Sequence, residues 1–466
     1  MTAVAPLVLF PFFDGNVLGA VLLWLLPFTV LWLLMEPSRR SDEMLHDART
    51  RAGGEILRDP LAYLLLAVAV LAVIRWMNEG IALAYMPEDR AWTISKPQVD
   101  WLPGSVAGCG RLPFAVACQL AVVTLGCRHA LGKSARVSFL FSGCLFAGVA
   151  ALAAVILGAL GNGTVLSVER CQPVDSSYLG SGFGLWALAG VVAVSGGFEL
   201  RWNKYLLLFS LGIGGSLAGL FFFAPTHVVI AYAAAFVVTL AGSLAYSWFT
   251  IGSTETCKCF IAIFLALLVP VLMCLWVASP DMLNDRFALF RDGVLFPEGF
   301  LDARKALSAV AAKAWSAHPW SGTGLGSFPL DIRFHALPED WNLFEHLQVT
   351  AHHGWWQFLA ERGLVGALAL AGLVGILLAA FAIRLVGSFG KSYFAPGAYF
   401  GFVVAAVVAA ESFVDVSMLR PEIALAALPL MAISVGSLPL SNRNANPSAR
   451  DTSASSGDGK ENSNHG

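Results

Sequence analysis

The chain has 466 residues, of which 57% are hydrophobic and only 13% are charged, and its mean hydropathy is +0.70. A soluble domain carries about 25% charged residues, so this composition is that of a membrane protein. The formal net charge of −2 gives no sign of a nucleic-acid partner.

Long apolar stretches recur along the chain, and a membrane-spanning helix needs about 20 mostly apolar residues. Stretches that meet this requirement are Asn16–Met35, Leu61–Met77, Leu112–Cys127, Val137–Leu160, Gly182–Phe198, Tyr205–Ala224, Val228–Phe249, Phe260–Ala278, Gly363–Ile383, Phe394–Ser412 and Pro421–Leu438. The sequence therefore predicts an all-α fold, a polytopic transmembrane helix bundle of about eleven spans.

Basic residues in short loops predict the orientation, because they are retained in the cytoplasm. One set of alternate loops contains Arg39, Arg40, Arg49, Arg51, Arg58, Arg128, Lys133, Arg136, Arg201, Lys204, Lys258, Arg384 and Lys391. The opposite set contains Arg75, Arg90, Lys96, Arg111, Arg170 and Arg420. The first set is richer, so it is expected in the cytoplasm, with the N-terminus outside and the C-terminus inside the cytoplasmic (inner) membrane.

Four parts of the chain follow from this pattern. Residues 1–278 are expected to form an N-terminal transmembrane bundle, and residues 363–438 the C-terminal transmembrane helices. Between them, residues 279–362 form one large periplasmic or extracellular loop that contains short helices, and loops of this length usually carry function. Residues 439–466, rich in Ser, Asn, Asp and Gly, are expected to be a disordered cytoplasmic tail.

The large loop contains a predicted helix, Leu301–Ser316, which Pro319 stops from continuing. Arg304 and Trp315 fall on one face of that helix, at helical spacing.

Three glycines follow the helix at alternate positions: Gly322, Gly324 and Gly326. They form either a flexible turn or a place where the backbone approaches a bulky anion closely. They are not a dinucleotide-binding fingerprint, because no predicted strand precedes them.

Two adjacent histidines, His352 and His353, lie just before the span that begins at Gly363. A histidine at a water–membrane boundary is either an ordinary hydrogen-bonded interfacial residue or a proton acceptor near neutral pH. Trp355 and Trp356 follow, and they fit either an interfacial aromatic belt or a platform on which a sugar stacks.

These residues carry a resemblance to a known family. The segment His352–Gly366 reads H-H-x9-G-x-x-G, which resembles the motif of the bacterial O-antigen ligase and O-antigen polymerase superfamily. The family pattern is a His, usually followed by Asn, Ser or Gln, then nine residues and G-x-x-G. The upstream block R…H-P-W-S-G-T-G-L-G-S-F, which begins at Arg304, and the multi-span topology with one large late loop are similar as well. His353 departs from the pattern, because it occupies the position of the family's Asn, Ser or Gln.

The resemblance implies a membrane glycosyltransferase of the cell envelope, of the kind that builds lipopolysaccharide and other polysaccharides. Its donor would be a polyprenyl-diphosphate-linked glycan, and its acceptor a lipid, a glycan or a protein. Ligase, polymerase and protein O-glycosyltransferase share this architecture, and the sequence does not separate them. No cofactor and no metal is required by such a reaction, because the donor already carries a good leaving group.

The same resemblance assigns roles to particular residues. His352 is the expected base, and which of His352 and His353 acts is left open. Arg304 is the first candidate for holding the donor diphosphate, because a guanidinium makes paired hydrogen bonds to phosphate. Arg291, Arg286 and Arg75 are weaker candidates for the same role. Further substrate-binding candidates are the glycines Gly322, Gly324 and Gly326, and Trp355.

Other functions and sites remain open at this point. A transporter is the main alternative, since polar residues such as Gln119 lie inside predicted spans, although no inverted repeat is evident. A zinc site built from His335, His346, His352, His353 and Glu345 matches no regular ligand spacing.

Two further features concern charged residues and cysteines outside the motif. Glu411 and Asp415 either pair with Arg420 at a helix end or have a function inside the membrane. A disulfide between Cys109 and Cys171 is expected, because both fall in loops predicted to face an oxidising compartment.

Overall fold

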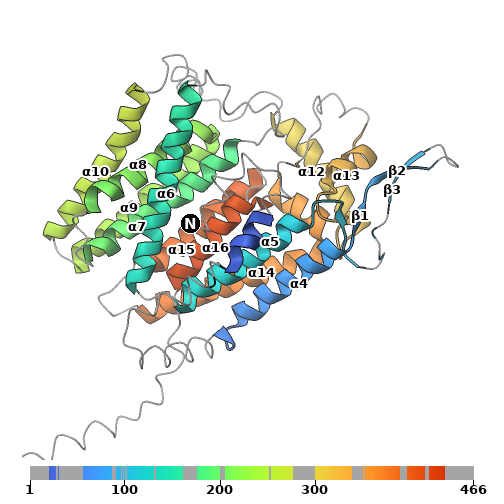
Figure 1. Ribbon diagram of the computed structural model, residues 1–466, viewed down its shortest axis with the longest axis horizontal. Coiled ribbons are helices and arrows are strands. Elements are labelled where there is room, and N and C mark those ends of the chain that lie inside the picture. Colours follow the sequence, from blue (N-terminus) through green and yellow to red (C-terminus); the bar gives the residue numbers. More distant parts are fainter. Residues whose placement is uncertain are drawn as a thin grey trace, which may run out of the picture. The chain divides into compact units, whose positions relative to one another are not determined.

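Helices dominate the computed structural model, which describes residues 20–27, 30, 56–86, 91–95, 97, 99, 102–130, 133–160, 176–199, 205–250, 253–276, 300–337, 350–351, 353–388, 396–414 and 419–435 (Figure 1). The helices are α4 (Pro60–Met77), α5 (Arg111–Leu125) with the π-helical turn η3 (Gly126–Ala130), α6 (Lys133–Leu160), α7 (Ser176–Glu199), α8 (Leu206–Phe223), α9 (Thr226–Thr250), α10 (Ser253–Trp276), α12 (Phe300–Ala317), α13 (Phe328–His335), α14 (Gly354–Ser388), α15 (Pro396–Val414) and α16 (Pro421–Val435). A mostly helical fold was predicted and is confirmed.

Six helical stretches of the described chain are long and apolar enough to cross a membrane: Pro60–Met77, Arg111–His129, Arg136–Ile156, Leu206–Phe223, Thr226–Ala245 and Gly354–Ile383. Shorter apolar stretches are Leu179–Val194, Thr256–Leu268, Tyr399–Val414 and Ile423–Ser434. All of them overlap spans that hydropathy predicted. The total of eleven spans stays a prediction, because the first predicted span lies mostly outside the described residues.

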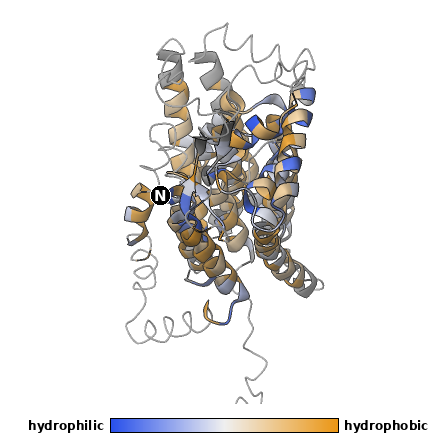
Figure 2. Ribbon diagram, turned by 90° about the vertical axis from the view of Figure 1, so that its right-hand side faces the viewer, coloured by the Kyte–Doolittle hydropathy of each residue, from blue (hydrophilic) through white to orange (hydrophobic). Residues whose placement is uncertain are grey.

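The surfaces of these helices are apolar, as lipid-facing surfaces must be. Phe260, Phe264 and Leu272 of α10 are between 54% and 60% exposed, and Leu368 of α14 is 63% exposed. Figure 2 shows the same property as orange along most of the helical ribbons. Contiguous exposed apolar surface of this kind is rare on soluble monomers, and it fits a hydrocarbon environment.

The helices form two groups joined by α15 and α16. In the first group α6, α7, α8, α9 and α10 pack on one another. Gly148 of α6 and Gly212 of α8 bring two backbones into contact, since a Cβ on Gly148 would lie 2.3 Å from the Gly212 carbonyl oxygen. Small residues at a helix crossing permit such close approach in membranes.

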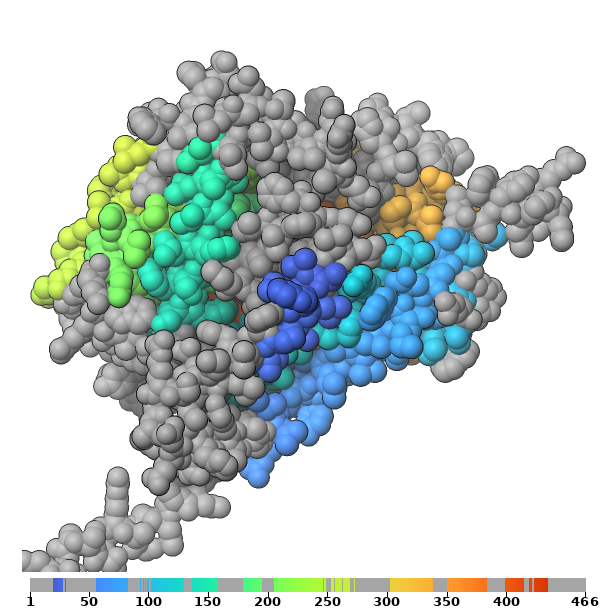
Figure 3. Space-filling model, in the orientation of Figure 1, coloured from blue at the N-terminus to red at the C-terminus, as the bar shows by residue number. Residues whose placement is uncertain are grey.

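The second group contains α4, α5 and α14, and it carries the loop region that includes α12 and α13. Leu22 of the N-terminal segment packs on Ala115 and Leu120 of α5, and Figure 3 shows that segment beside α5. The Gln119 side-chain nitrogen donates to the Leu22 carbonyl oxygen at 2.6 Å. The amide nitrogen of Gln119 therefore has a structural partner inside its span.

The prediction of an all-α fold was wrong in one respect, because four short strands lie between α4 and α5. Strand β1 (Glu79–Ile81) pairs in parallel with β4 (Ser105–Val106), and β2 (Leu83–Met86) pairs antiparallel with β3 (Ala91–Ile94). Strands of two to four residues are too short to show an alternating pattern. A further bridge joins Ser105 to Leu325, so this connection touches the large loop.

The large loop folds around the beginning of α14. Helix α12 confirms the helix predicted at Leu301–Ser316, and it ends before Pro319. Helix α14 begins at Gly354, nine residues before the predicted start of the span at Gly363, where the backbone leaves helical geometry with φ 62° and ψ −169°. Buried side chains of α12, α13 and α14, with Ala351 just before α14, form one core. Its residues are Leu307, Val310, Ala311, Ala314, Phe328, Ile332, Ala351 and Ala360. The predicted tail, residues 439–466, lies outside the described residues.

Candidate functional site

The turn that contains the glycine run caps the first segment of α14, residues 354–362. The amide of Thr323 donates to the Ala360 carbonyl oxygen at 2.7 Å, and that of Gly324 to the Glu361 carbonyl oxygen at 3.2 Å. At Gly363 helix α14 is kinked. Just after the kink, the Leu364 amide donates to the Pro319 carbonyl oxygen of the turn at 2.8 Å. The run thus satisfies carbonyl groups that a helix end leaves unpaired.

All three glycines of the run have positive φ: 73° at Gly322, 115° at Gly324 and 74° at Gly326. A Cβ at Gly322 would lie 2.5 Å from the carbonyl carbon of Glu361. The close approach to α14 therefore accounts for glycine at this position. The Gly322 and Gly324 amides donate to carbonyl groups of the protein, and a contact of the run with substrate stays a prediction.

Arg75, near the end of α4, holds the kink of α14 in place. Its guanidinium is buried and donates to three backbone carbonyl oxygens, those of Glu361 and Ser321 at 3.2 Å and that of Arg362 at 3.1 Å. Sequence reasoning named Arg75 only as a weak substrate-binding candidate. The described contacts give it a structural role as a clamp, and a contact of Arg75 with substrate stays a prediction. The signal for it was an arginine inside an apolar span.

Asp331 of α13 is a buried carboxyl group beside the glycine run, with 1% of its surface exposed. It accepts hydrogen bonds from the hydroxyl groups of Thr323 at 2.9 Å and Ser327 at 3.1 Å. Burial, helped by the nearby Glu361 charge, raises the pKa of Asp331 to about 7, although the two hydroxyl donors oppose the shift. Sequence reasoning missed this residue.

Gln357 and Glu361, one turn apart on α14, extend the polar network toward the histidines. The Gln357 side-chain nitrogen donates to Glu361 Oε1 at 2.9 Å, and its oxygen accepts from the Ala351 amide at 2.8 Å. The Gly326 amide also donates to the Glu361 carboxylate. The network therefore fixes the backbone immediately before His352, and sequence reasoning missed it as well.

His353 is held among aromatic rings at the start of α14. Its ring is 6.1 Å from that of Phe413 in α15 and 6.4 Å from that of Trp356, while the Trp355 ring is 5.8 Å from Phe413. The atoms His353 Nδ1 and Trp355 Nε1 are both buried and have no hydrogen-bond partner among the described residues. Two such groups side by side can be satisfied by a bound ligand.

The structure brings Arg304 of α12 close to His353. Burial and the positive charge of Arg304 both lower the pKa of the His353 imidazole, against an interaction with its own backbone that raises it. The imidazole is therefore neutral at neutral pH and able to accept a proton. Trp315, from the same helix face as Arg304, lies 6.1 Å from Trp356 and completes the aromatic cluster.

Several predicted residues lie outside the part of the chain that the structure describes: His352, Arg291, Arg286, His346, Glu345, Asp415 and Cys171. Their roles, and the disulfide of Cys109, stay predictions. No group of three or more His, Cys, Asp or Glu residues that could hold a metal occurs within the described ranges.

Glu411 is buried on α15, two residues before Phe413. Its carboxylate accepts hydrogen bonds from the hydroxyl groups of Ser181 in α7 and Tyr232 in α9, the latter at 3.3 Å. These bonds tie three helices together across the junction of the two groups.

No known family model and no curated protein matches the chain. Function therefore has to be inferred from the residues themselves. A neutral imidazole can take a proton from a hydroxyl group, and a neighbouring guanidinium can neutralise an anion. Aromatic faces beside them offer flat apolar surfaces with polar edges.

Proposed function

We propose that the protein is a membrane glycosyltransferase that transfers or polymerises a polyprenyl-diphosphate-linked glycan onto an acceptor. This is the activity implied by its resemblance to the O-antigen ligase and polymerase superfamily. The observation that carries the proposal is that Arg304 lies near enough to His353 for its charge to lower the pKa of the imidazole. Both residues belong to the motif blocks behind that resemblance and lie far apart in the sequence.

The proposed reaction gives each group one role. An acceptor hydroxyl attacks the anomeric carbon of the donor glycan, a new carbon–oxygen bond forms, and the bond to the diphosphate breaks. The histidine pair, His352 and His353, takes the proton of the hydroxyl group. Arg304 neutralises the charge of the departing diphosphate. The rings of Trp315, Trp355 and Trp356 offer stacking surfaces to the sugars.

The proposed location of the site is the outer face of the cytoplasmic membrane, supported by the basic residues of the alternate loops. A cysteine in place of the exposed Ser316 of α12 tests it. We expect this thiol to react with a membrane-impermeant reagent in cells whose outer membrane alone has been permeabilised. Labelling that requires rupture of the inner membrane would reverse the orientation.

The enzymatic proposal is tested by His352→Ala and His353→Ala in purified protein supplied with a lipid-linked glycan and an acceptor. Loss of a general base typically lowers the rate by about 10²–10⁴, so we expect one of the two variants to be nearly inactive and normally inserted in the membrane. The control is His335→Ala, because His335 lies on α13 outside the aromatic cluster. Wild-type transfer rates in both variants would exclude this catalytic role.

A transporter is the alternative class, and it is distinguished by the phenotype of a deletion strain. Loss of surface glycan supports the enzyme, whereas loss of uptake with normal glycan supports a carrier. The same strain separates the enzyme subclasses. A missing polymerase leaves single repeat units on the acceptor, and a missing ligase leaves long chains on the carrier lipid.

A further inference from the structure

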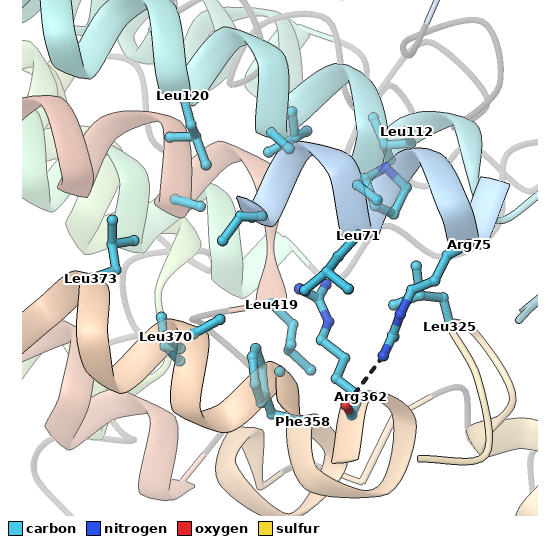
Figure 4. Close-up of a pocket in the computed structure, with 18 of the residues that line it drawn as sticks. Leu71, Arg75, Leu112, Leu120, Leu325, Phe358, Arg362, Leu370, Leu373 and Leu419 are labelled. Carbon is cyan, nitrogen blue, oxygen red and sulfur yellow. Dashed lines mark hydrogen bonds between the residues drawn. The ribbon is translucent and has the colours of Figure 1, made fainter. Parts of the chain in front are cut away.

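Helix α14 begins directly after His353, and two neighbouring helices hold its first segment. From α4, the Arg75 guanidinium donates to the Arg362 carbonyl oxygen at 3.1 Å, which is the contact drawn in Figure 4. The Arg362 side chain extends from there into a pocket of about 200 Å³ between α4, α5, α14 and α16. The second neighbour is α15, which also packs on α7 and α9.

Phe413, near the end of α15, is the contact of that helix with the candidate site. Its ring meets the His353 ring edge to face, with 6.1 Å between the ring centres and 76° between the planes. The Trp355 ring is 5.8 Å from it. Because 61% of Phe413 is exposed, no surrounding core holds the ring in place. Its position over the imidazole therefore depends on where the end of α15 lies.

Glu411, two residues before Phe413, fixes that end of α15. Its buried carboxylate accepts one hydrogen bond at each oxygen, from the Ser181 hydroxyl of α7 at Oε1 and from the Tyr232 hydroxyl of α9 at Oε2. The two donors belong to different helices. A carboxylate that serves both of them fixes the rotation of α15 as well as its position along the axis.

The surroundings of this carboxylate leave little room for adjustment. Ser181 is fully buried, and Tyr232 is 1% exposed. A Cβ on Gly184, one turn after Ser181, would lie 2.5 Å from the Tyr232 ring, so that ring packs directly on the backbone of α7. A buried carboxylate among apolar helices is costly without hydrogen bonds, so the two donors specify one place for it.

A second polar contact joins α15 to α9 and provides a comparison. The Tyr399 hydroxyl donates to the Thr239 carbonyl oxygen at 3.1 Å and lies 3.0 Å from the Ser243 hydroxyl oxygen. Tyr399 is 14 residues before Phe413, which corresponds to about 21 Å along a helix axis. This contact therefore holds α15 in the bundle far from the end that reaches His353.

We propose that Glu411 is a positioning residue of the candidate site, which holds the end of α15 where Phe413 covers one side of His353. The inference rests on the proposed function, in which the histidine pair takes the proton of the acceptor. Glu411 itself does not touch the substrate in this account. It acts through the Phe413 ring, which keeps water from the imidazole and so contributes to the burial that lowers the pKa of His353.

The experiment measures that pKa without requiring catalysis. Hydrogen–deuterium exchange at the C2 carbon of histidine, followed by mass spectrometry across a pH series, reports it for His353 in full-length protein in lipid nanodiscs. We expect Glu411→Leu and Phe413→Ala each to raise the pKa of His353 toward its ordinary value of 6.5, because water reaches the ring. Glu411→Gln should keep the wild-type pKa, since an amide can still bond both hydroxyl groups. The matched control is Tyr399→Phe, which removes the other contact and should leave the pKa unchanged.

Two further variants separate positioning from general loosening of the bundle. If Glu411 acts through Phe413, the double variant Glu411→Leu/Phe413→Ala should show the same pKa of His353 as either single variant. Tyr232→Phe removes one donor and keeps the packed ring, so it should shift the pKa in the same direction by less. An unchanged pKa in Phe413→Ala, or in both Glu411→Leu and Tyr232→Phe, overturns the proposal. So does an equal shift in Tyr399→Phe.

Kinetics separate this role from the enzymatic proposal. A misplacement of about 1 Å can cost about 10²-fold in rate, so Glu411→Leu should lower kcat by up to that factor, change the KM of the donor less, and be rescued by Glu411→Gln. A pKa of His353 that depends on Glu411, in a protein that transfers no glycan, leaves the positioning role and removes the enzyme. Wild-type kcat in Glu411→Leu, in a protein that transfers glycan, removes the positioning role and leaves the enzyme.

Discussion

The N-terminal and C-terminal ends of α4 surround their charged side chains with different partners. At the first end, the Asp59 carboxylate accepts from the Leu61 amide at 3.0 Å and lies 2.9 Å from the Arg128 Nε atom and 2.7 Å from the His129 Nε2 atom. At the other end, Arg75 is occupied by carbonyl groups, whereas Arg362 extends into an apolar pocket with an unused donor.

The two ends differ in whether a carboxylate lies against the buried or partly buried cation. Around Asp59 a cap, a cation and an imidazole share one carboxylate, so the Asp59 charge faces that of Arg128 and the cluster joins α4 to η3. Around Arg362 no carboxylate plays the corresponding part in the described contacts. Arg362 is only partly buried, and Glu361 acts on its charge without a hydrogen bond to the guanidinium in the described contacts.

The largest expected effect comes from removing the clamp. Arg75→Met leaves the Glu361, Ser321 and Arg362 carbonyl groups without their shared donor, and hydrogen bonds to a charged group contribute about 1.5–3 kcal/mol each without being additive. We expect a loss of roughly 3–5 kcal/mol in the free energy of unfolding, measured in detergent. Arg58→Met, which removes an exposed arginine near the first end of α4, is the control. Equal stability of the two variants would contradict the clamp.

A smaller loss is expected at the first end. Asp59→Asn keeps a cap for α4 but leaves Arg128 buried without its anion, so unfolding should become easier by roughly 2–3 kcal/mol. Burial alone would raise the pKa of Asp59, but His129, the Leu61 amide and Arg128 outweigh it and hold the pKa below 3.8. The stabilisation is therefore complete above the unfolded pKa and is lost as the pH falls through the folded one. A wild-type acid titration that matches the variant would disprove this account.

Asp331 reverses that pH dependence. Its folded pKa of about 7 exceeds its ordinary value of 3.8, so the native state keeps a proton that the unfolded state releases. Stability should decrease as the pH rises from about 4 to about 7, and Asp331→Asn should flatten this slope and add roughly 1–2 kcal/mol at neutral pH. Thermal unfolding across that pH range provides the measurement, and an unchanged slope in the variant would refute it.

The smallest effect on stability is expected from Arg362→Met. The Arg362 Nε atom has no hydrogen-bond partner among the described residues, and the side chain as a whole is only partly buried. The change in unfolding free energy should therefore stay within about 0.5 kcal/mol. If Arg362→Met lowered the free energy of unfolding as much as Arg75→Met does, the two arginines would contribute equally to stability, which would contradict this prediction.

Part of the candidate site could be predicted from the sequence. Helical spacing placed Arg304 and Trp315 on one face, and the structure brings that face to His353 and Trp356. Polar partners escaped prediction, because Asp331, Gln357 and Glu361 are ordinary surface residues by sequence and are buried only once α13 packs on α14.

The sequence by itself determined the membrane class, the position of most apolar helices and the helix of the large loop. These properties depend on the composition of continuous segments of about 20 residues, which hydropathy and helical periodicity report directly. Only the tertiary structure decided that α14 begins before its span, that the glycine run caps it, and that Arg75 and Arg362 have different roles. Those facts depend on contacts such as the one between Arg75 and Glu361, which are 286 residues apart, and no local pattern records which distant carbonyl group a guanidinium will find.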